Sequence, residues 1–416
     1  HFLRRKGRHG ENACQKEGGG RKMKFIDFFA GVGGFRRGME LAGHECVGFC
    51  EFDKFATASY TSMHLLTQEQ REFLDKMPLK QRQKEILKEE YRNGEWYAND
   101  IRRVYAGDIP KADCWCFGFP CQDISVAGKQ VGFQGNRSSL FFRVMYLIGQ
   151  LKEEDKPTYL FIENVKNLLS VNGGWDFARL LIEMEQGGYD AEWQVLNSKD
   201  FGVPQNRERC FIIGHLRGRS TAKVFPVERT DGENSIQIIG HKDGYRRNTQ
   251  VFAPDGLTET LDTGQGGGRG HHVALPCFVD LSYQKTELTN KARCLQARYN
   301  KGIANHKAEV SGVAIPVLTP DRAEKRQNTL DTSCNQGIFV QVSEELTVYA
   351  VWYEKYQCYI AIRRLTPKEC FRLQGWTDDY FEKAQFVNSD SQLYKQAGNG
   401  VTVNVIEAIA EKLRFA

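Results

Sequence analysis

The architecture of this chain follows from one stretch near its start, Lys24-Phe25-Ile26-Asp27-Phe28-Phe29-Ala30-Gly31-Val32-Gly33-Gly34-Phe35. Its first half is an apolar run with one aspartate, which is typical of a buried strand. Its second half places glycines directly after that strand, where a small residue lets the backbone approach a nucleotide-like ligand closely. Such a turn also occurs as a plain tight connection, and its Gly-x-Gly-Gly spacing differs from the dinucleotide-binding pattern.

An alternation of strands and helices continues from this stretch to about His215. Further buried strands are predicted at residues 46–50, 113–117, 159–162 and 210–213, with helices at 140–151 and 177–186. This order is typical of an α/β fold with a largely parallel, doubly wound sheet. We predict that residues 23–215 form this domain and that residues 385–416 complete it. A charged helical insertion is expected between Leu65 and Arg92.

Residues 216–341 have a different composition, with 13 glycines and 17 Lys or Arg against 13 Asp or Glu. Because glycine disfavours helices, we predict a smaller, mostly β or irregular domain over residues 216–384.

The first 22 residues carry seven Lys or Arg and two Asp or Glu, which accounts for the whole formal charge of +5. We expect this segment to be a disordered, non-native tail preceding a start at Met23, with a basic DNA-gripping arm as the alternative.

Composition excludes several classes of protein. Apolar runs stay far below the roughly 18 residues of a membrane span, and the N-terminus lacks the apolar core of a secretory signal. The twelve cysteines show no paired Cys-x-x-Cys spacing, which argues against a zinc site. We therefore predict a bacterial cytoplasmic protein that contacts no membrane, holds no metal and keeps its cysteines reduced.

One cysteine stands out among the twelve. Cys121, in Pro120-Cys121-Gln122, comes directly after a predicted buried strand, at the rim where α/β sheets bind ligands. A cysteine placed there is a candidate nucleophile, whereas cysteines inside strands, such as Cys114 and Cys116, fit small buried hydrophobes.

Other polar residues follow strands at the same rim. Glu51 lies 20 residues beyond Gly31, where an acid binds ribose hydroxyls. Glu163-Asn164-Val165 brings a second carboxyl group. Arg207 and Arg209 are two residues apart, so in a strand both would face one side and could clamp a phosphate or a base edge. Each arginine taken singly also fits an exposed surface position.

Together, in this order, these segments resemble the DNA cytosine-C5 methyltransferase family of the bacterial or phage restriction-modification type. The resemblance runs from Lys24 to about Ala410 and includes five segments that match its motifs: Asp27–Gly34, Pro120-Cys121-Gln122, Glu163-Asn164-Val165, Gln205–Arg209 and Gln396–Val401. It implies a Rossmann-like S-adenosylmethionine-dependent methyltransferase domain joined to a target-recognition domain.

The resemblance also implies a cofactor site that holds S-adenosylmethionine and releases S-adenosylhomocysteine. Phe29 and Phe52 would lie against the adenine, and Glu51 would bind the ribose. Asp100-Ile101 and Asp108-Ile109 compete for the adenine amino group, and Asp100, 21 residues before Cys121, fits the family spacing better than Asp108 at 13. The full implied set is Asp27, Phe29, Ala30, Gly31, Gly33, Gly34, Glu51, Phe52, Asp100, Ile101, Pro120, Leu140, Asn399, Gly400 and Val401. Gly400 departs from the serine that many members have.

For catalysis, the resemblance implies that Cys121 adds covalently to C6 of a cytosine flipped out of duplex DNA. Glu163 would bind N3 and the exocyclic amine, and Arg209 would hold O2. Arg207 would bind a phosphate or support the loop. The segment 123–135 would form a lid on the DNA, with Gln122, Ser125, Lys129 and Asn164 as DNA contacts.

The expected partner is double-stranded DNA, which the enzyme would methylate to protect host DNA, and a cognate restriction endonuclease would act separately. A monomer is expected. One alternative is a tRNA cytosine-5 methyltransferase, although those relatives have a short variable region and this chain has a long one. The other alternative is a catalytically silent DNA-binding protein, which the presence of Cys121, Glu163 and Arg209 disfavours.

Overall fold

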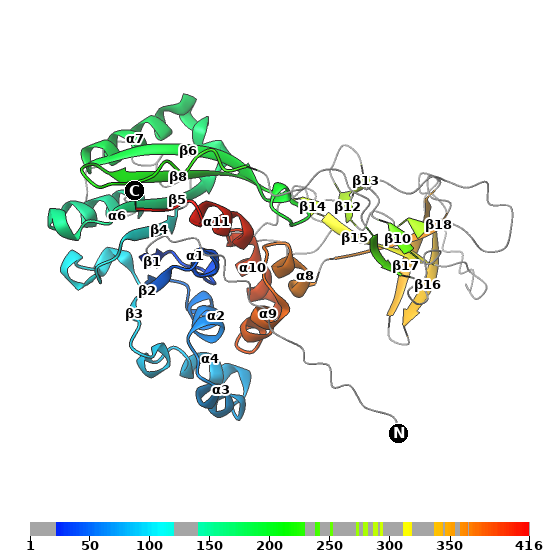
Figure 1. The fold of residues 1–416 in the computed structure, drawn as a ribbon. Coiled ribbons are helices and arrows are strands. Elements are labelled where there is room, and N and C mark those ends of the chain that lie inside the picture. Colours follow the sequence, from blue (N-terminus) through cyan, green and yellow to red (C-terminus); the bar gives the residue numbers. More distant parts are fainter. Residues whose placement is uncertain are drawn as a thin grey trace, which may run out of the picture.

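The computed structural model describes residues 22–119, 140–228 and 366–415, together with the backbone of short strands between residues 238 and 364 (Figure 1). At its centre lies a seven-stranded sheet of order β3-β2-β1-β4-β5-β8-β6. Its strands are β1 (Lys24–Phe28), β2 (Glu45–Cys50), β3 (Trp96–Ala98), β4 (Cys114–Gly118), β5 (Tyr159–Val165), β6 (Tyr189–Asn197) and β8 (Glu208–Leu216).

The first five strands of this sheet run parallel, and β8 runs antiparallel to both β5 and β6. The largely parallel α/β fold expected from the sequence is therefore confirmed. Two strands were missed. β3 has only three residues, and β6 is an edge strand with a mixed burial pattern and no continuous apolar run.

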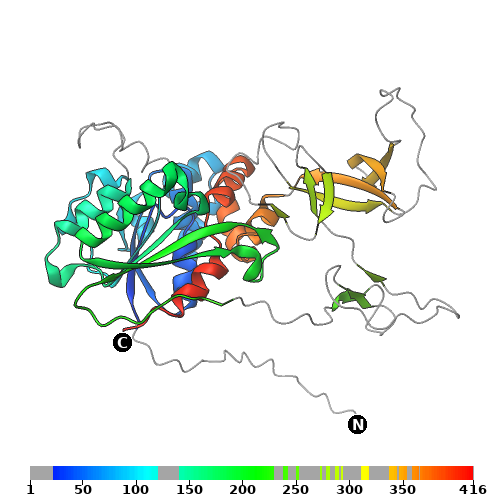
Figure 2. The ribbon, with the colours of Figure 1, turned by 90° about the horizontal axis from the view of Figure 1, so that it is seen from above.

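Helices cover both faces of the sheet (Figure 2). One face packs against α6 (Leu140–Gly149) and α7 (Trp175–Gln186), and the other against α1 (Gly34–Leu41) and α11 (Val403–Ala410). Successive side chains of a strand point to opposite faces, so Phe25 joins the core beside α1 and α11, whereas Ile26 and Phe28 join the core beside α6 and α7. Burial on both faces explains the unbroken apolar runs of the sequence.

The remaining helices build the flank of the domain. They are α2 (Lys54–His64), α3 (Gln68–Asp75), α4 (Leu79–Glu85), α8 (Pro367–Arg372), α9 (Asp378–Gln385) and α10 (Asp390–Asn399). Helices α3 and α4 form the insertion expected between Leu65 and Arg92. Arg82 fixes this insertion because its guanidinium donates to the carbonyl oxygens of Leu74, Met77 and Phe386 at 2.7 to 3.0 Å.

Short 3-10 helices connect these elements. They are η1 (Glu89–Arg92), η2 (Ile101–Arg103), η3 (Ala106–Asp108), η4 (Glu153–Asp155), η5 (Lys166–Leu169), η6 (Val171–Gly174) and η7 (Ser198–Asp200). In the described part of the chain, no helix combines the length and apolar character needed to cross a membrane.

The region between residues 229 and 365 is described only by backbone strands. Six of them form an antiparallel sheet of order β13-β12-β15-β18-β17-β16, and three form a second sheet of order β11-β10-β9. The bounds are β9 (Ile238–His241), β10 (Gln250–Phe252), β11 (His272–Val273), β12 (Phe278–Leu281), β13 (Thr286–Thr289), β15 (Ser311–Val317), β16 (Gly337–Ser343), β17 (Leu346–Tyr353) and β18 (Cys358–Arg364). These strands agree with the predicted β character.

Among the described strands, a short backbone pairing joins this region to the first domain. The short strand β14 (Ala292–Arg293) pairs in parallel with β7 (Gln205–Asn206), which directly precedes Arg207. Segments at both ends of the predicted recognition domain, residues 216–384, pack with the first domain instead. Val224, Phe225 and Val227 belong to the core beside α11, and α8 and α9 pack with α10. The division of the chain into domains otherwise stays a prediction.

Glycines let α1 and α11 approach each other closely. A Cβ atom at Gly38 would lie 2.5 Å from Cβ of Ile406 and 2.9 Å from the backbone nitrogen of Glu407. We therefore predict that Gly38→Ala lowers the free energy of unfolding by about 1–3 kcal/mol, since overpacking forces the two helices apart. Urea denaturation measures this. Gly149→Ala in α6 is the control, because a Cβ there meets nothing within 4 Å. Equal stability of Gly38→Ala and the wild type would contradict the close helix contact.

Candidate cofactor and active site

The sheet order brings the predicted site residues to one edge. Glu51 follows β2, the turn Phe29–Gly34 follows β1 and Asp100 follows β3. Phe119 follows β4, and Glu163 lies near the end of the neighbouring strand β5. Residues scattered over 130 positions of sequence therefore meet at the carboxyl ends of adjacent parallel strands, where α/β sheets bind ligands.

The glycine-rich turn is held by Glu51. The backbone nitrogen of Gly31 donates to Oε2 of Glu51 at 2.8 Å, and that of Asp53 donates to Oε1 at 2.7 Å. Phe29 and Gly31 both have left-handed backbone conformations, with φ of 56° and 57°. Burial raises the pKa of the Glu51 carboxyl. This acid fixes the turn as well as lying where the ribose-binding residue was expected.

Two further glycines of the turn make room for side chains from elsewhere in the chain. A Cβ at Gly34 would lie 2.6 Å from Cγ2 of Val401, and one at Gly33 would lie 2.5 Å from Nε2 of His64. Nε2 of His64 is 3.0 Å from the carbonyl oxygen of Val32. Burial lowers the pKa of His64 well below its ordinary value, so the neutral ring donates to this carbonyl. The C-terminal segment thus closes directly onto the turn.

Asp27 lies beneath the turn and away from its surface. Its side chain is fully buried, and Oδ2 accepts a hydrogen bond from the backbone nitrogen of Arg36 at 3.3 Å. Burial raises the pKa of this carboxyl well above its ordinary value. Because Arg36 is in the first turn of α1, this bond joins the end of β1 to the start of that helix and helps to shape the turn. The expected contact of Asp27 with the cofactor stays a prediction.

Aromatic and acidic side chains gather at the ends of β2 and β3. Phe52 is 73% exposed, and the Asp100 carboxylate caps η2 by accepting from the backbone nitrogen of Arg102 at 3.0 Å. Ile101 is buried. The competing Asp108 lies on the surface at the end of η3. The choice of Asp100 stays a prediction, and its place directly after β3 favours it, because β3 pairs with the strand that precedes Phe52.

An ion pair joins two predicted catalytic residues. Nε of Arg209 lies 3.0 Å from Oε1 of Glu163, and the two side chains are 16% and 12% exposed. Gly118 pairs with Glu163 across β4 and β5, and a Cβ at Gly118 would come within 3.1 Å of Oε2. Gly118, which lies three residues before Cys121, therefore leaves space for the Glu163 carboxylate.

Asn164 was expected at the DNA, but its side chain is only 2% exposed. Its Nδ2 donates to the carbonyl oxygen of Phe119 at 2.8 Å, and its Oδ1 accepts from the backbone nitrogen of Val165. Burial leaves this amide little surface for a DNA contact. Its bond instead fixes the backbone immediately before Pro120.

Arg207 and Arg209 go to different partners. Arg207 is buried, and its Nη2 donates to the carbonyl oxygen of Gly400 at 2.7 Å, with that of Gly398 at 3.5 Å. The interpretation of the two arginines as a clamp on one strand face is wrong, because β7 ends before Arg207 and β8 begins after it. Arg207 braces the segment Asn399–Val401 that the sequence placed at the cofactor.

A buried polar network behind this segment was missed by the sequence analysis. Thr402 Oγ1 lies 2.8 Å from Oγ of Ser198 and 2.9 Å from Oε1 of Gln374, and Nε2 of Gln374 donates to the carbonyl oxygen of Ala397 at 2.7 Å. Gln205 Nε2 donates to the carbonyl oxygen of Leu373. Neutral side chains such as these form no recognisable charge pattern in the sequence. Their hydrogen bonds also join segments that lie far apart in the sequence, so the network could not be predicted.

Several predicted site residues lie outside the described residues. They are Pro120, Cys121, Gln122, Ser125 and Lys129, together with the rest of the expected lid, residues 123–135. Leu140, the first residue of α6, lies against the core beside that helix. Among the described residues, no group of three or more His, Cys, Asp or Glu side chains is arranged to hold a metal ion.

A family model described as C-5 cytosine-specific DNA methylase matches residues 23–414. The chain belongs to this family. Similar proteins include the orphan methyltransferase M.SPRI of Bacillus phage SPR, which is 28% identical with 94% of this chain and 97% of that protein covered. The type II methyltransferase M2.ScrFI of Lactococcus lactis subsp. cremoris is 30% identical, with 94% of this chain and 99% of that protein covered.

Solved structures support the fold of the methyltransferase. The S. pombe Dnmt2 methyltransferase matches with a TM-score of 0.50 at 14% identity, over 93% of this chain and 96% of that chain. The match of the family model to residues 23–414 and the relative at 30% identity confirm the family and enzyme class predicted from the sequence. Membership implies S-adenosylmethionine as the methyl donor and DNA as the substrate.

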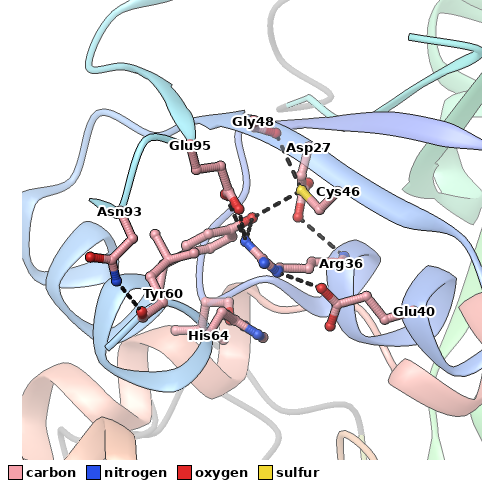
Figure 3. Close-up of polar contacts among 11 residues, drawn as sticks. Asp27, Arg36, Glu40, Cys46, Gly48, Tyr60, His64, Asn93 and Glu95 are labelled. Atoms are coloured by element: carbon pink, nitrogen blue, oxygen red, sulfur yellow. Dashed lines mark hydrogen bonds and ion pairs between the residues drawn. The ribbon is translucent and has the colours of Figure 1, made fainter. Parts of the chain in front are cut away.

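A buried ion cluster surrounds Arg36, in the first turn of α1 (Figure 3). Nη1 of Arg36 lies 2.7 and 2.9 Å from the two carboxylate oxygens of Glu95, and 3.2 Å from the Tyr60 hydroxyl. Nε of Arg36 donates to Glu40 at 2.8 Å. The guanidinium thereby ties α1 to α2 and to the residue preceding β3.

We predict that Glu95→Ala lowers the free energy of unfolding by about 3 kcal/mol, because it removes the main partner of a buried guanidinium. The Arg36 and Glu95 side chains are only 9% and 12% exposed. Thermal and urea denaturation measure the change. Lys88→Ala is the control, since it breaks the surface pair of Lys88 with Glu85 and should leave stability nearly unchanged. Equal losses in the two variants would show that the cluster stabilises no more than a surface pair.

Proposed function

We propose that this protein transfers a methyl group to C5 of a cytosine flipped out of a specific duplex DNA sequence, through a covalent bond between Cys121 and C6. The observation that carries the proposal is the Glu163–Arg209 pair, with nitrogen and oxygen 3.0 Å apart, at the end of β5. It lies beside Gly118, from which the chain leads to Cys121. A carboxyl group, a guanidinium and a cysteine are the groups that activation of cytosine requires.

The described residues fit S-adenosylmethionine. Phe29 and Phe52 offer aromatic surface for adenine, and the partly buried Glu51 carboxylate offers acceptors for ribose hydroxyls. A Cβ at Gly31 meets no atom within 4 Å, so the turn leaves the space a close ligand needs. We propose that Asn399, Gly400 and Val401 close the site, since Val401 contacts the turn at Gly34.

Cytosine C5 is too weak a nucleophile to accept a methyl group unaided. The Cys121 thiolate adds to C6, which forms an S–C bond and makes C5 the nucleophilic carbon of an enamine. Glu163 hydrogen-bonds N3 and the exocyclic amine, and so stabilises the charge that develops during this addition. Arg209 holds both Glu163 and the O2 edge of the base.

Bound S-adenosylmethionine supplies an electrophilic methyl group to the activated C5. Loss of the C5 proton and elimination of the Cys121 thiolate then restore the aromatic base. Inside a stacked duplex these atoms are inaccessible, so the target cytosine must be flipped out. We propose that Gln122, Ser125 and Lys129 contact the DNA. Asn164 and Arg207 act as positioning residues, through Phe119 and Gly400.

We propose narrower limits for the target-recognition region, about residues 229–365, than the sequence predicted. Its basic side chains, among 17 Lys or Arg against 15 Asp or Glu, would contact phosphates, and its strands and loops would read base edges. We further propose that the enzyme acts as a monomer in the cytoplasm and protects host DNA, with any cognate endonuclease acting separately. The similarity to an orphan methyltransferase of a phage also fits a role without such a nuclease.

The covalent step is tested by Cys121→Ser. We expect this variant to lose methylation of duplex DNA by several orders of magnitude while it still binds S-adenosylhomocysteine. Transfer of labelled methyl groups measures the first property, and isothermal titration calorimetry the second. Cys14→Ser, ahead of Met23, should retain activity. Full activity of Cys121→Ser would overturn the mechanism.

Methylation of tRNA in preference to duplex DNA by the wild type would favour the tRNA alternative. Binding of duplex DNA by the wild type without methylation would favour a silent DNA-binding protein.

Glu163→Gln separates chemistry from binding. We expect turnover to fall by roughly 100-fold or more, because stabilisation of the developing charge is lost, while DNA affinity changes little. Single-turnover kinetics and DNA-binding titrations measure the two quantities. Glu208→Gln, the same change at an exposed residue of β8 paired with Lys166, should leave both nearly unchanged. A pure loss of DNA affinity in Glu163→Gln would contradict the role of Glu163.

A further inference from the structure

The carboxylate of Asp100 is held by a side chain that the sequence analysis did not single out. Nε of Arg102 donates to Oδ1 at 2.8 Å, and Nη2 donates to Oδ2 at 2.8 Å, so the guanidinium forms a two-pronged fork. The backbone nitrogen of Arg102 donates to Oδ1 at 3.0 Å. Asp100 is 10% exposed and Arg102 is 55% exposed, so the fork covers the carboxylate from the solvent side.

These bonds leave one acceptor position on the carboxylate. Each oxygen of an ionised carboxylate can accept about two hydrogen bonds. The backbone and Nε of Arg102 fill both positions of Oδ1, and Nη2 fills one position of Oδ2. Nε of Arg103 is 4.0 Å from Oδ2, a distance that suits attraction between charges and exceeds a hydrogen bond. Among the donors of the described residues, none fills the second position on Oδ2, so this position is available for a donor from a ligand.

A residue of helix α6 holds the turn that carries Arg102. Arg143, on α6, donates from Nε to the carbonyl oxygen of Ile101 at 3.2 Å and from Nη2 to that of Val104 at 2.7 Å. Ile101 itself is 2% exposed. Because the backbone around η2 is fixed, the fork has a preset direction, unlike an ion pair between two free surface side chains.

Arg102 also reaches toward the aromatic side of the site. Its Cζ atom lies 5.7 Å from the centre of the Phe52 ring. Phe52 follows Glu51 at the end of β2, which pairs with β3 in the register Cys50 with Ala98. The free position of Asp100, the Phe52 ring and the Glu51 carboxylate thus lie at the ends of two adjacent strands.

We infer that Arg102 is a positioning residue of the cofactor site, which orients Asp100 so that its remaining oxygen position accepts the 6-amino group of adenine. Arg102 also holds the pKa of Asp100 below its ordinary value, so the carboxylate stays an acceptor in mildly acidic solution. The inference rests on the proposed function, in which Asp100 belongs to the cofactor site. An Asp100 carboxylate held in this way would favour purines that carry a 6-amino group over purines that carry a 6-oxo group.

Calorimetric titration with S-adenosylhomocysteine and S-inosylhomocysteine tests the inference, because the two probes differ at position 6 of the purine ring. We expect the wild type to bind the adenosine compound more tightly. Arg102→Ala should weaken that binding by roughly tenfold and reduce the preference between the probes by a similar factor, since the carboxylate loses its fixed direction. Arg102→Lys keeps the charge without the planar fork and should restore little of the preference.

The pH dependence gives a second readout. Removal of Arg102 raises the pKa of Asp100 toward its ordinary value, so more of the carboxyl becomes protonated as the pH falls. Binding of S-adenosylhomocysteine to Arg102→Ala should therefore weaken at a higher pH than binding to the wild type. Arg103→Ala is the matched control, because it removes the neighbouring positive charge and no hydrogen bond to Asp100. Its affinity should change less than about twofold.

Asp100→Ala separates the two proposals, because alanine has no acceptor for the 6-amino group. If Asp100→Ala binds S-adenosylhomocysteine as tightly as the wild type, the place of Asp100 in the cofactor site of the proposed function is wrong. If Asp100→Ala loses binding while Arg102→Ala keeps the affinity and preference of the wild type, the proposed function stands and the role of Arg102 is overturned. Tighter binding by Arg102→Ala would equally overturn it, because Arg102 would then compete with the adenine.

Discussion

Both faces of the central sheet are covered by helices, so polar side chains can meet a ligand only where the strands end. Phe25, Ile26 and Phe28 are all fully buried although they point to opposite faces of β1. The chain accordingly keeps its strands apolar and places its acids and glycines immediately after them. Glu51, Asp100 and Glu163 share one edge of the sheet for this reason. The site is a consequence of how the sheet is buried.

The C-terminal fifty residues complete that edge from a distance in sequence. Val401 lies on Gly34, Arg207 binds the carbonyl oxygens of Gly398 and Gly400, and Thr402 joins a polar network with Ser198 and Gln374. Buried neutral groups bonded in this way hold one geometry strongly, because each lost partner would leave an unsatisfied polar atom. The glycine-rich turn after β1 is thus shaped by its own glycines and by the last helices of the chain.

Much of this could be predicted from local pattern, and the failures have physical causes. Apolar runs identified β1, β2, β4, β5 and β8, because burial on both faces leaves little choice of residue. The edge strand β6 was missed because half of it meets solvent. Spacing along a strand suggested that Arg207 and Arg209 act together, but a break at Arg207 sends them to different partners. Asp27 and Asn164 are buried and form hydrogen bonds with the backbone of Arg36 and Phe119, respectively. These contacts cannot be deduced from the sequence.

The parallel pairing of β7 with β14 connects the recognition region to the backbone directly before Arg207. From there, Arg207 reaches the carbonyl oxygen of Gly400 and Arg209 reaches Glu163. A recognition region transplanted from a relative to change sequence preference would have to supply a strand edge at the same place. Grafts chosen only for their base contacts would disturb these two arginines and the side-chain contacts that they make. Exchange of the recognition region in this enzyme therefore requires that the backbone pairing with the two residues of β7 be kept.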